Sequence, residues 1–172
     1  MEAADACAAL DALEAAGIRV VVNGGWGVDA LLGEQTRAHD DLDVHLSIDD
    51  LEDVCQALAG LGYNECLSRD GRLENFVLRA PADRRVDLHA VRFDGSGGGV
   101  YIMPDGTDWI WPEGSFSGTG SIGGRPVACL SFEGQLLEHT GYALDDTDRL
   151  DVARLRERFG LALPEPYRPN SA

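Results

Sequence analysis

The segment from residue 42 to residue 48 constrains the fold of this chain most, because apolar side chains occupy every second position. The apolar residues are Leu42, Val44, Leu46 and Ile48. This period of two predicts a β-strand with one buried face and one polar face. Asp41 and Asp43, at the start of the segment, then project side by side from the polar face.

The rest of the chain predicts a mixed β-sheet flanked by helices, which is an α+β fold. Further strands are expected over 18–22, 63–68, 75–79 and 85–93, and a hairpin over 120–130 that turns at residues 123–124. Helices are expected over 4–16, 26–32, 132–142 and 145–159, and one more after Asp49, which with Glu52 forms a capping box. We expect one domain over 1–172, with an α/β core over 1–130, C-terminal helices over 131–163 and an irregular tail over 164–172.

The charge of the chain narrows the choice of partners. Thirty acidic residues face fourteen basic ones, all arginine, and the net charge is −16. Such a charge repels a nucleic-acid backbone and suits a cationic small molecule, although solubility alone is an equal explanation. No apolar run approaches the roughly 18 residues of a membrane span, and the N-terminus lacks the basic region of a secretory signal. We therefore expect a cytoplasmic protein that binds neither nucleic acid nor membrane.

Two carboxylates on one strand face suggest a metal site. Asp41 and Asp43 would repel each other, and a hard cation such as Mg²⁺ removes that cost because it prefers oxygen ligands. The alternative is that both residues belong to a solvated strand face.

Gly24 and Gly25 stand between a predicted strand and a predicted helix. Glycines there let the backbone approach a phosphate, and the free N–H groups at the helix start favour an anion. A third carboxylate, Asp87, lies on the predicted strand 85–93 and shares a face with His89. If this strand pairs with the one carrying Asp43, Asp87 becomes a third metal ligand or a general base. An ion pair with Arg84 or Arg85 is the alternative role.

The motifs taken together resemble a known family. They are GGWGVDALLG at 24–33, TR at 36–37, His39, DLD at 41–43, RVDLH at 85–89, GTGSIGGRPV at 118–127 and HTGY at 139–142. This set is similar to the lincosamide nucleotidyltransferases and the aminoglycoside 2''-adenylyltransferases, which belong to the DNA polymerase beta-like nucleotidyltransferase superfamily. The resemblance extends over nearly the whole chain and implies the nucleotidyltransferase fold with two C-terminal helices.

The resemblance also implies roles for single residues. Gly24 and Gly25 would hold a triphosphate, Asp41 and Asp43 would bind Mg²⁺, and Asp87 would be the catalytic third carboxylate.

Three residues between the glycines and the aspartates have two possible roles each. Arg37 would neutralise a phosphate, or else pair with Asp29 or Asp40. His39 would contact the phosphates, or else act as a hydrogen-bonded hinge residue. Trp26 would either contact the nucleotide or anchor the helix by packing.

The residues proposed for the acceptor have weaker support. They are Glu113, which could meet an amine, and His139 and Tyr142, which would share one face of the helix expected over 132–142. Trp109 and Trp111 could stack on a ring, or pack in the core.

The expected activity is Mg²⁺-dependent transfer of a nucleoside monophosphate from ATP or another NTP to a hydroxyl of a small molecule. One or two Mg²⁺ ions would take part. The resemblance suggests a cationic antibiotic as the acceptor, either a lincosamide or an aminoglycoside, with modification giving resistance. The alternatives are transfer to a protein partner of the toxin–antitoxin type, or a catalytically silent nucleotide-binding module. A homodimer could help to close the site.

Overall fold

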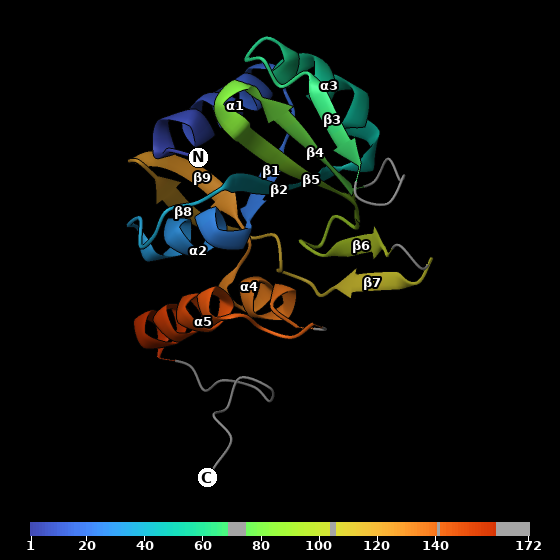
Figure 1. Ribbon diagram of the computed structural model, residues 1–172. Helices are drawn as coiled ribbons and strands as arrows, with labels where there is room; N and C mark the ends of the chain where they lie inside the picture. The colour runs from blue at the N-terminus through green and yellow to red at the C-terminus, as the bar shows by residue number, and fades with distance from the viewer. Residues whose placement is uncertain (69–74, 104–105, 141, 161–172) are drawn as a thin grey trace.

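The strand expected over residues 42–48 is β2 (Asp41–Ser47), and it lies in the middle of a mixed sheet (Figure 1). A computed structural model describes residues 1–68, 75–103, 106–140 and 142–160. β2 pairs antiparallel with β1 (Val20–Asn23) and parallel with β5 (Arg84–Phe93). The strand order is β3-β4-β5-β2-β1-β9-β8, completed by β3 (Glu65–Ser68), β4 (Asn75–Ala80), β8 (Gly118–Ile122) and β9 (Arg125–Cys129).

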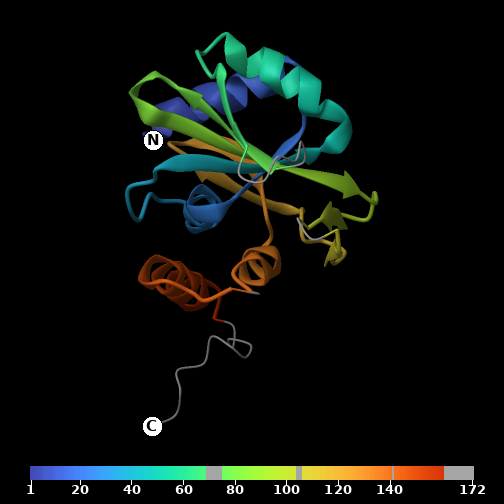
Figure 2. The ribbon, with the colours of Figure 1, turned by 45° about the vertical axis from the view of Figure 1, so that its right-hand side comes forward.

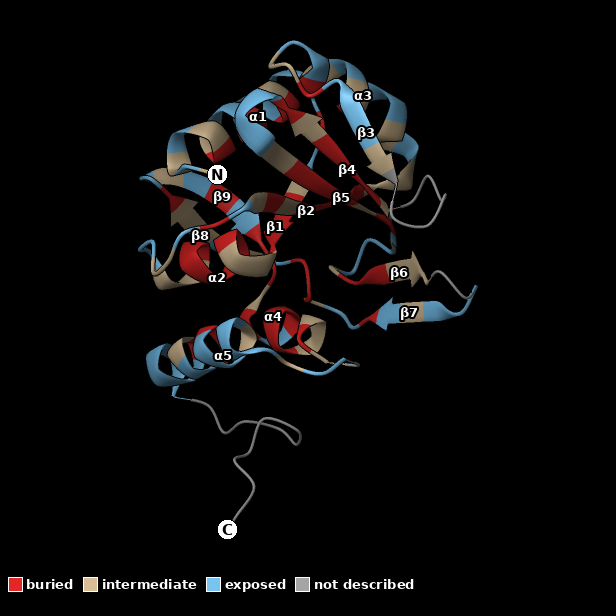
Figure 3. Cartoon of the chain, viewed as in Figure 1, coloured by how far each residue is buried: buried red, intermediate tan, exposed pale blue. Residues whose placement is uncertain are grey.

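Helices cover both faces of this sheet. α1 (Ala3–Ala15) and α3 (Leu51–Ala59) lie on one face, and α2 (Gly24–Leu32) lies on the other (Figures 1 and 2). α4 (Phe132–Glu138) and α5 (Asp146–Phe159) pack against α2 on the side away from the sheet. The expected mixed sheet with flanking helices is confirmed, and the apolar face of β2 joins the largest cluster of buried residues (Figure 3).

A small extension of the sheet was not predicted. The end of β5 pairs with β6 (Gly99–Ile102), which in turn pairs with β7 (Asp108–Trp111). Glycines at 95 and 97–99 predicted a loop tip, and the strand that begins at Gly99 was missed. This strand is stabilised by pairing with β5 rather than by the β-propensity of its own residues. Trp109 and Trp111 share one face of β7, as the two-residue spacing requires.

Two helix predictions were wrong in detail. The capping box of Asp49 with Glu52 does not form; a 3-10 turn (Ile48–Asp50) comes first, and the Ser47 hydroxyl accepts a hydrogen bond from the Asp49 N–H. α4 ends at Glu138, four residues earlier than expected, with His139 as its C-cap. The predicted tail over 164–172 lies outside the described residues. In the described part of the chain, no helix is both long enough and apolar enough to cross a membrane.

The burial of β5 makes a test of this fold possible. The Leu88 side chain is fully buried, so Leu88→Ala should lower the free energy of unfolding by about 2–5 kcal/mol through lost contacts and a residual cavity. Arg92→Ala, at an exposed position of the same strand, should change it by less than about 0.5 kcal/mol. Urea denaturation followed by circular dichroism measures both. Equal losses in the two variants would contradict the packing described here.

Candidate active site

The parallel pairing of β2 with β5 brings two acidic side chains together. Asp43 is the direct neighbour of Asp87 in this register, and His45 is the neighbour of His89. Ligand atoms of Asp43, Asp87 and His89 all lie within 4.8 Å of one another. The Nε2 atom of His89 is 3.7 Å from Asp43 Oδ1 and 3.8 Å from Asp87 Oδ1. The predicted convergence of the two strands on one site is therefore present in the structure.

The charge state of His89 shows what this position attracts. Burial by itself would lower the pKa of His89, but the hydrogen bond to Asp43 and the charges of Asp87, Asp43 and Glu138 outweigh it and raise the pKa to about 9. The neighbouring His45 is buried, and burial together with the charge of His89 holds its pKa well below the usual value. The carboxylates around His89 thus favour its protonated form.

Asp41 stands apart from this group. It begins β2 beside Arg85. Among the described residues, the set within 4.8 Å contains His89 in place of Asp41. The role of Asp41 as a metal ligand stays a prediction.

Gly24 is the first residue of α2 and lies against the Asp43 carboxylate. Its neighbour Asn23 pairs with Asp43 across the sheet, and Gly24 has a φ of +57°. A Cβ atom at this position would lie 2.3 Å from Asp43 Oδ2. Only glycine allows this close approach, and it places the N-terminus of α2 directly against the acidic group.

Gly25 makes room for two of the predicted phosphate contacts. A Cβ atom at Gly25 would lie 2.3 Å from Arg37 Nη2 and 2.6 Å from His39 Nδ1. Both side chains therefore come up against the backbone of the first turn of α2. The structure places Gly24, Gly25, Arg37 and His39 together, and their contact with phosphate stays a prediction.

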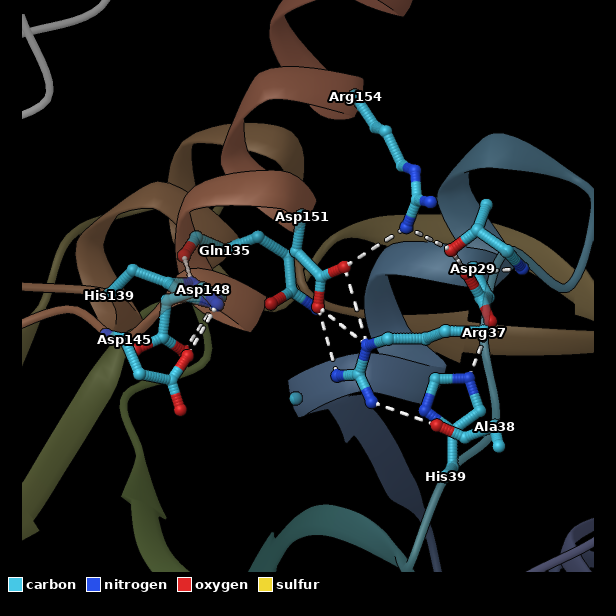
Figure 4. Close-up of polar contacts among 12 residues, drawn as sticks. Asp29, Arg37, Ala38, His39, Gln135, His139, Asp145, Asp148, Asp151 and Arg154 are labelled. Carbon is cyan, nitrogen blue, oxygen red and sulfur yellow. Dashed lines mark hydrogen bonds and ion pairs between the residues drawn. The ribbon is translucent and has the colours of Figure 1, made fainter. Parts of the chain in front are cut away.

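Arg37 is held by a partner in α5 that the sequence analysis did not predict. Its Nε and Nη2 atoms donate to Asp151 Oδ2 of α5 at 3.1 and 2.9 Å (Figure 4). Pairing with Asp29 or Asp40 was therefore the wrong alternative, because the packing of α5 on α2 supplies a partner 114 residues away. Asp151 is 2% exposed and the Arg37 side chain 30%, so the guanidinium reaches the surface from a buried anchor.

Asp29 instead holds His39. The two side chains are joined at 2.5 Å, between His39 Nε2 and Asp29 Oδ2, and both are buried. The Trp26 ring, 2% exposed, lies 4.2 Å from the His39 ring. Trp26 thus packs behind His39, as its alternative role as a packing anchor requires, and it offers no open face for a base.

An aromatic cavity of about 210 Å³ opens next to the acidic group. It is lined by His45, His89, Tyr101, Met103, Trp109, Trp111, Glu138, Thr140 and Tyr142. Trp109 and Trp111 thus border a space suited to a ring or an apolar body, while Trp111 also packs in a core cluster. The last turn of α4 and the residues after it form one wall of the cavity.

Glu138 is a residue that the sequence analysis missed. Its Oε1 accepts a 2.6 Å hydrogen bond from Asn23 Nδ2, and its Oε2 accepts from the Gly24 N–H at 3.4 Å. Burial raises the pKa of the Glu138 carboxyl, against the opposing influence of His89 and Asn23. An acidic residue in the last turn of a helix opposes the helix dipole, and this was the signal available in the sequence.

The three residues predicted to contact an acceptor lie in different places. Tyr142 lines the cavity. His139 is buried, with its Nδ1 2.7 Å from the Gln135 carbonyl and its Nε2 3.8 Å from Asp148 (Figure 4). Glu113 is exposed in the turn after β7 and lines a separate hollow with Ser131 and Glu133. Because α4 ends at Glu138, His139 and Tyr142 do not share a helical face.

Comparison with known proteins shows the family to which this chain belongs. The model of the aminoglycoside-2''-adenylyltransferase family matches residues 6–155. The chain belongs to this family. It is a nucleotidyltransferase, and the glycine bend with its carboxylates lies in the matched region.

Similar proteins come from both branches that the motifs resemble. A lincosamide resistance protein of Staphylococcus haemolyticus is 32% identical, over 86% of this chain and 89% of its own length. A 2''-aminoglycoside nucleotidyltransferase of Escherichia coli is 30% identical, over 71% of this chain and 63% of its own length.

Solved structures show the same fold as this nucleotidyltransferase. The lincosamide antibiotic adenylyltransferase LnuA, bound to lincomycin, superposes with a TM-score of 0.73 at 29% identity, covering 86% of this chain and 91% of that chain. ANT(2'')-Ia in complex with adenylyl-2''-tobramycin reaches a TM-score of 0.66 at 22% identity, with 87% and 84% covered. The predicted resemblance and the nucleotidyltransferase fold are both confirmed.

The contact between Gly24 and Asp43 gives a test of the site in this nucleotidyltransferase. Gly24→Ala should weaken divalent-cation binding, because the new Cβ atom displaces the Asp43 carboxylate. Gly33→Ala is the matched control, since Gly33 also has a positive φ (+79°) but an added Cβ would meet nothing within 4 Å. Each should lose about 1–2 kcal/mol of stability from backbone strain.

Titration with Mn²⁺, followed by electron paramagnetic resonance, separates the two variants. Binding should fall only in Gly24→Ala. If both variants bound Mn²⁺ as tightly as the wild-type protein does, the contact between Gly24 and Asp43 would not determine cation binding.

Proposed function

We propose that this nucleotidyltransferase transfers a nucleoside monophosphate from ATP or another NTP to a hydroxyl of a small cationic antibiotic, in a reaction that depends on Mg²⁺. The observation that carries the proposal is the contact between the glycine bend and the carboxylate pair, where Gly24 touches Asp43 and Asp43 neighbours Asp87. A triphosphate needs N–H groups that bind its oxygens and a cation that neutralises its charge. The glycine bend would offer the N–H groups, and the carboxylates next to it would hold the cation.

The carboxylate pair fits a magnesium ion. Asp43 and Asp87 offer oxygen donors, the ligands that Mg²⁺ prefers, and the raised pKa of His89 reflects the demand for positive charge there. In our proposal Asp43 and Asp87 hold the ion, and Asp41 on the same strand remains a predicted further ligand. When bound, Mg²⁺ neutralises charge on the leaving pyrophosphate and lowers the pKa of the attacking hydroxyl.

The side chains and backbone of the protein would bind the phosphates and accept the proton of the acceptor hydroxyl. In the proposed reaction the N–H groups at the start of α2 bind the triphosphate, a role supported by the hydrogen bond from the Gly24 N–H to the Glu138 carboxylate. Arg37, held by Asp151 against Gly25, offers positive charge to the phosphates as charge builds on the leaving group. Asp87, 2% exposed, takes the proton of the acceptor hydroxyl.

The cavity between β7 and the end of α4 is the proposed acceptor site. It adjoins the carboxylate pair through His89, and aromatic rings and Glu138 suit a molecule with an apolar body and an amine. This composition, together with the similarity to LnuA, favours a lincosamide over an aminoglycoside, because Glu138 is the single carboxylate among the described lining residues and several amines would need more. Modification of the drug would confer resistance.

Removal of the Asp87 carboxylate tests the proposal. Asp87→Asn should lower the rate of pyrophosphate release by about 10²–10⁴-fold, because the amide cannot accept the proton of the acceptor hydroxyl. The assay contains ATP, Mg²⁺ and either lincomycin or tobramycin, and each is omitted in turn. Asp53→Asn, at an exposed position of α3, is the control and should leave the rate unchanged. Wild-type protein that releases no pyrophosphate with either drug and any of the four NTPs would refute the proposed function.

A further inference from the structure

The Glu138 side chain reaches two places that the proposed reaction uses separately. One of its carboxylate oxygens accepts a hydrogen bond from the Gly24 N–H, at the start of α2. The same side chain lines the aromatic cavity beside Trp109 and Tyr101. It therefore stands on the boundary between the phosphate cradle and the acceptor cavity.

The contact with Gly24 competes with a triphosphate. An incoming phosphate oxygen would seek the same backbone N–H, and a carboxylate that stayed there would repel it. The bond to Gly24 is the longer of the two made by Glu138, at 3.4 Å against 2.6 Å to Asn23. Loss of the hydrogen bond between the Glu138 carboxylate and the Gly24 N–H should therefore cost little free energy.

The cavity offers the carboxylate a second partner. Among the described residues that line the cavity, Glu138 is the single acidic one, and the aromatic rings around it favour an organic cation. Burial already makes the Glu138 carboxylate less stable than in water, so pairing with an ammonium group gains more there than at the surface.

We propose that Glu138 is a specificity-determining residue that couples the two substrates: it fills the phosphate cradle in the free enzyme and binds the amine of the acceptor once the nucleotide has displaced it. This inference rests on the proposed function. Its consequence is that nucleotide and acceptor each tighten the binding of the other, by the same factor. A carboxylate that only stabilised the start of α2 would produce no such coupling.

The first measurement is the affinity for a magnesium complex of α,β-methylene ATP, which cannot transfer its nucleotide. Glu138→Gln keeps the shape and the Asn23 contact but removes the charge, so it should bind the analogue about tenfold more tightly. Glu133→Gln removes an exposed carboxylate from the same helix and should bind as the wild type does. Thermal melting of the three proteins shows that each is folded.

The second measurement is the affinity for the acceptor, lincomycin or tobramycin, whichever supports pyrophosphate release. In the wild type and in Glu133→Gln, a saturating amount of the analogue should tighten acceptor binding about tenfold. In Glu138→Gln the acceptor should bind more weakly, and the analogue should change its affinity less than about twofold. Undiminished coupling in Glu138→Gln, or an equal loss in Glu133→Gln, would overturn the inference.

The two proposals fail in different ways. Wild-type protein that releases pyrophosphate while Glu138→Gln keeps full coupling would refute the coupling role and leave the proposed function intact. Wild-type protein that neither binds the analogue nor releases pyrophosphate would refute both.

Discussion

The site depends on the in-register parallel pairing of β2 with β5, which sets Asp43 beside Asp87. Two neighbouring carboxylates in a partly buried place repel each other, and the surrounding structure must compensate. His89 supplies positive charge from within the same pair of strands, and the positive end of α2 is pressed against Asp43 through Gly24. The pairing of the two strands therefore creates the concentration of negative charge on which the proposed cation site depends.

The second half of the site is fixed by the C-terminal helices. α5 anchors Arg37 through Asp151, and α4 carries Glu138 to the first N–H of α2. Both contacts join residues about 114 positions apart in the chain. The proposed substrate-binding surface thus lies between the sheet with α2 on one side and the two last helices on the other.

Local patterns predicted much of this arrangement and missed its long-range parts. The alternation in β2, the glycines at 24–25 and the two-residue spacing of Asp87 and His89 are properties of neighbouring residues, so they predicted the strands, the bend and the facing carboxylates. The partner of Arg37, the position of Glu138 and the strands β6 and β7 depend on packing between distant segments, which no local pattern encodes. His89 was seen on the right face, but its place in the acidic group required the register with β2.

The anchoring of Arg37 has a consequence for how this protein can be shortened or fused. The Arg37 guanidinium is held by one carboxylate of α5, Asp151, which lies near the middle of the helix. A fragment that ended before this residue would keep every strand of the central sheet, yet it would lose the buried partner of the Arg37 guanidinium. We therefore expect the smallest working version of the enzyme to include α5, because its Asp151 holds the arginine proposed to bind phosphate.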